Sequence, residues 1–208
     1  ENTLKAFEQA GKQPRYDGIE CDIYTTSDGI FVVHHDPTLN RLSGINQKIM
    51  DLSYDELSTT GYIIHGKGKE RIPSLVEFLD VCSIYHKTPI VEIKQVHDIA
   101  QLTELVEIIN KYHFLEPIVI SFNLNYLKYI RTISDMSLQL LLTKIDDAII
   151  YDCKVNEIDL SINKESITRK LVKDLKEQHF KVAIFTVNHK EMFERYDKMG
   201  IDYLTTDL

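Results

Sequence analysis

The sequence predicts an α/β protein, a (β/α)8 TIM barrel, on three observations. Extended and helical segments alternate along all 208 residues, and no low-complexity linker or clear repeat interrupts them. Alternating βα units imply a parallel sheet covered by helices. Counting the first arm of an early hairpin as a barrel strand gives seven strands, in a chain that opens on a helix and finishes on a strand.

One strand before Glu1 and one helix after Leu208 would complete the barrel. A doubly wound open sheet is the alternative, but no glycine-rich phosphate loop follows any expected strand. The hydrophobic content of 43% is ample for a single core, so we expect one domain over residues 1–208.

Local signals place the elements in order. A helix opens at Asn2 or Thr3 and ends at Gly11, and a hairpin follows over residues 18–36. Capping boxes at 53–56 and 74–77 begin two further helices, the second reaching about Tyr85. The remaining elements are strands at 88–94, 118–121, 138–142, 157–162, 182–187 and 203–206, and helices at 98–112, 123–133, 145–151, 165–179 and 190–199.

The first arm of the hairpin carries two acids on one face. Ile19, Cys21 and Ile23 alternate with Glu20 and Asp22, so a strand sends both carboxylates to one side. Like charges repel, and burying an unpaired carboxylate costs several kcal/mol unless a cation or donors meet it. A metal ion is the simplest remedy, and a solvent-facing edge strand is the alternative.

Two adjacent histidines end the second arm. Asp28-Gly29 is a strong turn signal, and a two-residue loop there would place His35 on the face of the carboxylates and His34 on the opposite face. A three-residue loop would reverse this choice.

A third acid lies on the next strand. Barrel active sites gather at the carboxyl ends of strands, so Glu92 can converge with Glu20 and Asp22. Three carboxylates suit Mg²⁺ or Ca²⁺. Lys94 lies two residues after Glu92 and therefore on the same face. In isolation, an exposed strand end with a surface ion pair would explain Glu92 and Lys94 equally well.

Composition excludes several classes of protein. The formal net charge is −8 with acids and bases interspersed, which argues against a nucleic-acid binder. Cys21, Cys82 and Cys153 are widely spaced, so we read them as small core residues. No apolar run approaches the ~20 residues of a membrane helix, and we expect this part of the protein to be soluble.

Short motifs lie along the chain in a fixed order. They are Glu1-Asn2-Thr3-Leu4-Lys5-Ala6-Phe7, Glu20-Cys21-Asp22, Thr26-Ser27-Asp28-Gly29, His35-Asp36, Leu39-Asn40-Arg41, Ile72-Pro73-Ser74-Leu75, Glu92-Ile93-Lys94 and Phe185-Thr186-Val187-Asn188. In order and spacing they resemble the glycerophosphodiester phosphodiesterase (GDPD) family over nearly the whole chain. The resemblance also implies the barrel, with a small family insertion at about 40–72.

The resemblance implies a role for each site residue. The metal ligands would be Glu20, Asp22 and Glu92, holding Mg²⁺ or Ca²⁺. His35 matches the family's second catalytic histidine, and Lys94 would hold the substrate phosphate during catalysis. The first histidine and its arginine belong to a His-Arg-Gly motif that would lie before Glu1.

Two further residues match the family's pattern. Glu1 would orient the arginine of that His-Arg-Gly motif. Phe185 stands where the family commonly carries tryptophan, as an apolar wall against the substrate, although a core phenylalanine explains it as well. The implied reaction is metal-dependent hydrolysis of a small glycerophosphodiester to glycerol 3-phosphate and an alcohol. The alternatives are a phospholipase D-like enzyme of the same fold that forms a cyclic phosphate, and a non-catalytic module that binds phosphate or a lipid headgroup.

Overall fold

A computed structural model describes residues 1–65, 68–114 and 116–208. The chain forms two compact units. The first comprises Glu1–Val119 and Thr132–Met136, and the second comprises Ile120–Arg131 and Ser137–Leu208. Strand β6 (Ile118–Ser121) is divided between them.

The sheet of the first unit centres on β1. Strand β1 (Gly18–Thr25) pairs antiparallel with β2 (Phe31–Val33) and parallel with β5 (Thr88–Gln95). The hairpin and the parallel neighbour predicted from the sequence are therefore both present. The other elements of this unit are α1 (Leu4–Gly11), α2 (Asn40–Ser43), η1 (Ile49–Asp51), α3 (Tyr54–Thr60), β3 (Tyr62–His65), β4 (Gly68–Arg71), α4 (Leu75–Ile84) and α5 (Gln101–Asn110).

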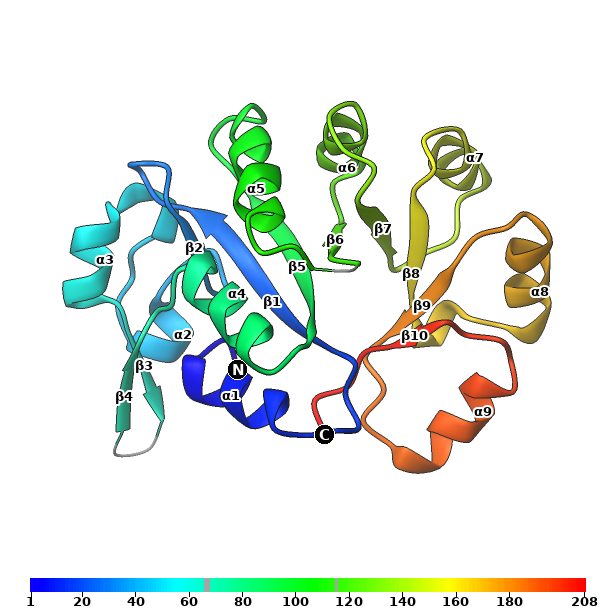
Figure 1. Cartoon of the computed structure of the whole chain (residues 1–208), viewed down its shortest axis with the longest axis horizontal. Helices are drawn as coiled ribbons and strands as arrows, with labels where there is room; N and C mark the ends of the chain where they lie inside the picture. Colours follow the sequence, from blue (N-terminus) through cyan, green and yellow to red (C-terminus); the bar gives the residue numbers. More distant parts are fainter. Residues whose placement is uncertain (66–67, 115) are drawn as a thin grey trace. The chain divides into compact units, whose positions relative to one another are not determined.

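Helices α1 and α4 lie side by side in the first unit (Figure 1). Their contact includes an edge-to-face pair between Phe7 and Phe78, with ring centroids 4.8 Å apart. Both helices begin where the sequence predicts. The Thr3 hydroxyl accepts a hydrogen bond from the Ala6 N–H, and Ser74 forms a complete capping box with Glu77.

The predicted insertion at 40–72 has its own small core. Ile49, Leu57 and Ile63 are fully or almost fully buried there and pack with Leu39, which precedes the insertion, and with Tyr24 of β1. The insertion also contains the antiparallel ribbon of β3 and β4, which the sequence analysis did not predict. Packing on Tyr24 ties the insertion to the strand that carries Glu20 and Asp22.

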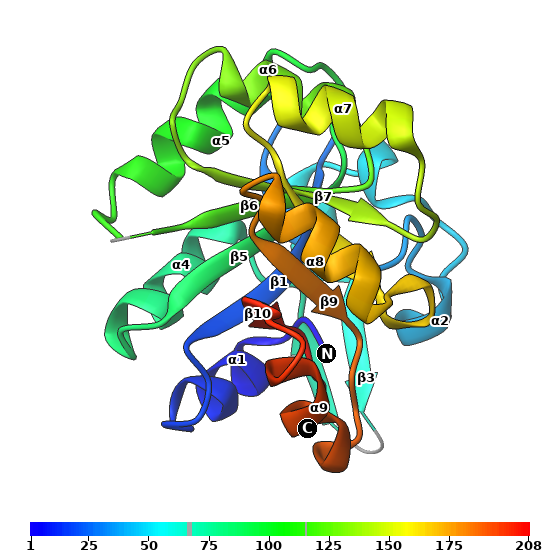
Figure 2. The ribbon, with the colours of Figure 1, turned by 90° about the vertical axis from the view of Figure 1, so that its right-hand side faces the viewer.

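The second unit continues the βα alternation. Strands β7, β8, β9 and β10 pair in parallel in that order, and α8 lies beside β9 (Figure 2). The elements are α6 (Leu124–Arg131), β7 (Ser137–Leu142), α7 (Asp147–Val155), β8 (Asp159–Asn163), η2 (Lys164–Ser166), α8 (Arg169–Glu177), β9 (Val182–Phe185), η3 (Lys190–Met192), α9 (Phe193–Asp197) and β10 (Tyr203–Leu204).

Two helices predicted in the second unit each divide into a short 3-10 helix and an α-helix. The segment expected as one helix at 165–179 divides into η2 and α8, because Thr168 is extended and caps a new helix by accepting from the Leu171 N–H. The helix expected at 190–199 divides into η3 and α9.

Two predictions drawn from composition can be compared with the described residues. All three cysteines are buried and free, as expected of core residues. Within residues 1–65, 68–114 and 116–208, no helix is both long and apolar enough to cross a bilayer.

We expect Ser74→Ala to lower the free energy of unfolding by about 1 kcal/mol, because it removes the acceptor that caps α4. Urea denaturation measures this change. Ser83→Ala, at an exposed position in the last turn of the same helix, is the matched control and should leave stability unchanged or slightly raised. Equal losses in the two variants would contradict the capping role.

Candidate active site

Three carboxylates converge on neighbouring strands of the first unit. The register of β1 and β5 places Asp22 directly beside Glu92, and Glu20 lies two residues before Asp22 on the same face. One ligand oxygen from each of the three side chains lies within 4.8 Å of the others. The structure thus brings together the residues that the sequence analysis selected as metal ligands. Oxygen donors of this kind suit Mg²⁺ or Ca²⁺.

Burial makes this cluster electrostatically demanding. Asp22 is 4% exposed and Glu92 is 8% exposed. Burial, and then the nearby charge of Asp22, raises the pKa of the Glu92 carboxyl above its ordinary value. A positive charge is required for the carboxylates to remain ionised together.

Lys94 supplies one such charge. Its Nζ lies 2.7 Å from Glu92 Oε1 and 3.1 Å from Asp22 Oδ1. Burial alone would lower the pKa of Lys94, but the charge of Asp22 and the hydrogen bond to Glu92 outweigh it and raise this pKa. Lys94 is also the extra residue of a β-bulge, because Ile23 pairs with Ile93 whereas Tyr24 pairs with Gln95.

Asn2 holds Asp22 from the other side, a role that the sequence analysis missed. Its Nδ2 donates to Asp22 Oδ2 at 2.8 Å, and its Oδ1 accepts from the Asp22 N–H at 3.2 Å. Asn2 is 7% exposed and has a φ of 53°, a conformation that asparagine tolerates better than most residues. The available signal was its place in the motif Glu1-Asn2-Thr3, for which no role was assigned.

The register of the hairpin differs from the one expected, in which a two-residue loop placed His35 on the face of the carboxylates and His34 on the opposite face. The observed partners are Ile23 with Val33, Tyr24 with Val32 and Thr25 with Phe31, so the loop spans residues 26–30. Continuing this register places His34 opposite Asp22, and the His34 N–H donates to the Asp22 carbonyl at 2.9 Å. The expected two-residue loop is therefore wrong, and strand parity gives no support to His35.

The surroundings of the two histidines nevertheless differ sharply. His34 is fully buried, and burial lowers its pKa. The His35 side chain is 51% exposed, and its Nδ1 lies 2.7 Å from Asp36 Oδ1. The Tyr24 hydroxyl donates to the His35 carbonyl at 3.3 Å, and burial raises the pKa of Tyr24 to about 12. Only His35 presents its imidazole to solvent.

Glu1 meets an arginine, but one within the described chain. Its carboxylate accepts a hydrogen bond from Arg41 Nη2, and Arg41 also contacts Asp36. Burial would raise the pKa of Glu1, but the hydrogen bond and charge of Arg41 outweigh it and lower this pKa. Arg41 and Asp36 belong to the motifs Leu39-Asn40-Arg41 and His35-Asp36, which alone predicted no role for either residue.

Phe185 belongs to the second unit. Its ring packs edge-to-face on Phe122, with centroids 6.0 Å apart, and Phe122 is 52% exposed. Both residues stand at the carboxyl ends of their strands. Phe185 is thus half-buried beside an exposed aromatic ring, and its role as an apolar wall against the substrate stays a prediction.

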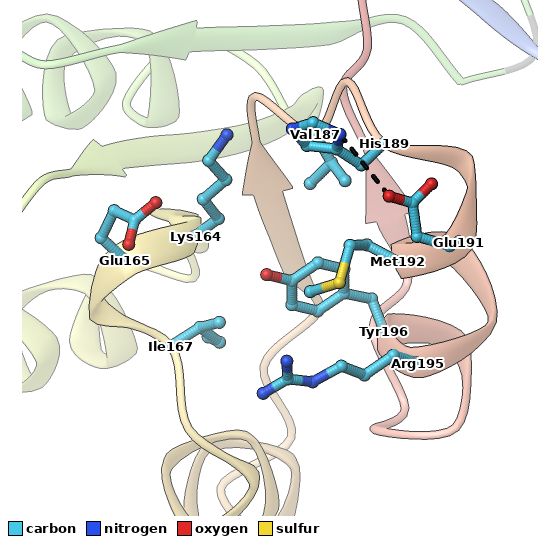
Figure 3. A pocket seen from close by; sticks show the side chains of 9 residues that line it. All are labelled: Lys164, Glu165, Ile167, Val187, His189, Glu191, Met192, Arg195 and Tyr196. Carbon is cyan, nitrogen blue, oxygen red and sulfur yellow. Dashed lines mark ion pairs between the residues drawn. The ribbon is translucent and has the colours of Figure 1, made fainter.

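A hollow of about 550 Å³ lies in the second unit (Figure 3). Its lining includes Lys164 and Arg195 as well as Glu165 and Glu191, and His189 lies 3.6 Å from Glu191. Because the lining carries both positive and negative side chains, it does not indicate whether an anionic or a cationic ligand would bind in this hollow. The hollow contains none of the residues that the sequence analysis assigned to the site.

Comparison with known proteins gives concordant results. The model of the glycerophosphoryl diester phosphodiesterase family matches residues 1–208. A glycerophosphodiester phosphodiesterase of Caldanaerobacter subterraneus subsp. tengcongensis is 30% identical over 222 residues, covering 100% of this chain and 88% of the relative.

Solved structures agree. A phosphodiesterase of Oleispira antarctica, in complex with the product sn-glycerol-3-phosphate, has a TM-score of 0.87 at 23% identity, covering 100% of this chain and 87% of that one. A glycerophosphodiester phosphodiesterase of Parabacteroides distasonis has a TM-score of 0.81 at 25% identity, covering 100% and 86%. The predicted fold class, an α/β TIM barrel, is confirmed by these relatives. The chain belongs to the glycerophosphoryl diester phosphodiesterase family and is a phosphoric diester hydrolase.

Proposed function

We propose that this protein hydrolyses glycerophosphodiesters to glycerol 3-phosphate and an alcohol, using a divalent cation held by Glu20, Asp22 and Glu92. The observation that carries the proposal is the convergence of these three carboxylates within 4.8 Å, in a chain that matches the family over its whole length. The bound product in the Oleispira antarctica relative supports glycerol 3-phosphate as the product here. Mg²⁺ and Ca²⁺ are the expected ions.

When bound, the ion would supply positive charge to the phosphoryl oxygens. Side chains of this protein would provide further positive charge and hold the carboxylates in position. Lys94 lies against Asp22 and Glu92 and provides a second, fixed positive charge for the phosphate. Asn2 prevents Asp22 from turning away, since it binds both the side chain and the backbone of that residue.

His35 is the group in this chain that we expect to move a proton. It is the exposed histidine of the adjacent pair, and one of its ring nitrogens is already held by Asp36. The other nitrogen is left for general acid–base work during in-line attack on phosphorus.

The first prediction concerns turnover. The full-length protein, supplied with Mg²⁺ or Ca²⁺ and glycerophosphocholine or glycerophosphoethanolamine, should release glycerol 3-phosphate in a coupled dehydrogenase assay. Phosphorus NMR of the products distinguishes the alternatives. A cyclic phosphate would indicate a phospholipase D-like reaction, and binding without turnover would indicate a headgroup-binding module. Either result would replace the proposed reaction.

The second prediction concerns the ion. Glu20→Gln and Asp22→Asn should each abolish binding of Mg²⁺ or Ca²⁺ in a calorimetric titration, because each removes a charged ligand and little volume. Stability without added ion should stay equal or rise, since the substitution relieves repulsion among carboxylates. Glu107→Gln, at an exposed position on α5, is the control and should leave ion affinity unchanged. Unaltered affinity in both site variants would remove Glu20 and Asp22 from the metal site.

The third prediction separates the two histidines. His35→Ala should lose about 10²–10⁴-fold in kcat at unchanged fold, because it removes an acid–base group. His34→Ala should lose mainly stability, about 1–3 kcal/mol, because it empties a fully buried position.

Both measurements should use the full-length protein, with kcat corrected for the folded fraction. A His34→Ala enzyme that is inactive while His35→Ala turns over normally would assign the proton transfer to the buried histidine instead.

A further inference from the structure

Asp36 lies between His35 and Arg41 and contacts both side chains. We propose that Asp36 is a positioning residue. Clamped by Arg41, it holds the Nδ1–H of His35 so that Nε2 is the nitrogen that exchanges a proton with the substrate. The inference rests on the proposed function, because it assigns to Asp36 an effect exerted through His35.

The contact between His35 and Asp36 determines which ring nitrogen carries the proton. An ionised carboxylate only accepts hydrogen bonds, so the Nδ1 that lies 2.7 Å from Asp36 Oδ1 must be the donor. In the neutral imidazole the lone pair then resides on Nε2. With the tautomer fixed in this way, the imidazole is ready to accept a proton at a single, defined atom.

Arg41 holds the carboxylate of Asp36 in place. Its Nε donates to Asp36 Oδ2 at 2.6 Å and its Nη2 donates to Asp36 Oδ1 at 3.1 Å, so both carboxylate oxygens are held. Two-point contacts of this kind constrain orientation as well as distance. The hydrogen bond from Arg41, and then the one from His35, lowers the pKa of Asp36 to about 2, so the carboxylate stays ionised at working pH.

The Glu1 carboxylate accepts a hydrogen bond from Arg41 and forms an ion pair with it. Four side chains from three separate segments of the first unit therefore form one continuous series, ending at the exposed imidazole. The Arg41 side chain is 48% exposed and that of Asp36 is 21% exposed. Ion pairs exposed to this degree contribute little to stability, so orientation of His35 is the effect that we expect to matter.

A closely matched pair in the same unit serves as the control. Arg71 binds Glu77 through two nitrogens, and the side chains are 44% and 26% exposed. The pKa of Glu77 is likewise lowered to about 2, first by the hydrogen bond from Arg71. This pair braces the start of α4 and touches no histidine of the proposed site, so its loss reports what an arginine–carboxylate pair contributes to folding alone.

The kinetic test is a double-mutant cycle on the full-length protein with glycerophosphocholine. We expect Asp36→Ala to lower kcat roughly 10–100-fold with little change in KM, by analogy with other residues that orient a reacting group. In a His35→Ala background the same substitution should cost nothing further. Glu77→Gln should leave kcat unchanged. An equal loss from Asp36→Ala with and without His35 would overturn the positioning role.

The spectroscopic test does not depend on activity. Nitrogen NMR of the neutral His35 ring should show Nδ1–H in the parent protein and a shift toward Nε2–H in Asp36→Ala, with no shift in Glu77→Gln. If Asp36→Ala fails to fold, Arg41→Ala weakens the clamp while retaining the carboxylate, and it should loosen the same tautomer preference. A ring that shows the same tautomer in all variants would overturn the proposal. Full activity in His35→Ala would instead remove the acid–base role of His35 and leave the tautomer result standing.

Discussion

Repulsion among three carboxylates is the constraint around which the first unit is built. Parallel pairing of β1 with β5 places Asp22 beside Glu92, and alternation along β1 adds Glu20 on the same face. Burial, and then the nearby charge of Asp22, raises the pKa of the Glu92 carboxyl. Lys94 and the amide of Asn2 offset part of the repulsion within the chain. Clusters of buried ionisable groups with shifted pKa values are typical of functional sites.

The residue that we propose for proton transfer stands on a different kind of backbone. The carboxylates project from paired strands, whereas His35 stands beyond the end of β2 on irregular backbone. Hydrogen bonds from side chains, and not strand pairing, hold His35 in place. Asp36 contacts the imidazole of His35 and is itself held by Arg41, and the Tyr24 hydroxyl donates to the His35 carbonyl. A side chain on a loop that is held by its own hydrogen bonds can be oriented independently of the carboxylates on the strands.

Patterns within a few residues of one another correctly predicted features that depend on neighbouring residues, such as strand alternation and helix capping. Strand alternation placed Glu20 and Asp22 together, and the capping box at Ser74 set the start of α4. The hairpin register failed because the Thr26 hydroxyl and Asp28 carboxylate close a wider turn than Asp28-Gly29 alone suggests. The partners of Glu1 and Asn2 lie 40 and 20 residues away, and no periodicity predicts such contacts.

The bulge at Lys94 gives β5 one residue more than β1 needs for regular pairing. Before it, Ile93 pairs with Ile23, and after it, Gln95 pairs with Tyr24. Deleting one residue here would restore regular pairing between the two strands. The extra residue, however, is Lys94, whose ammonium group lies beside the carboxylates of Asp22 and Glu92. The length of this strand is therefore under a constraint of its own. Shortening it would make the pairing of β1 and β5 regular but would remove the ammonium group that lies beside Asp22 and Glu92.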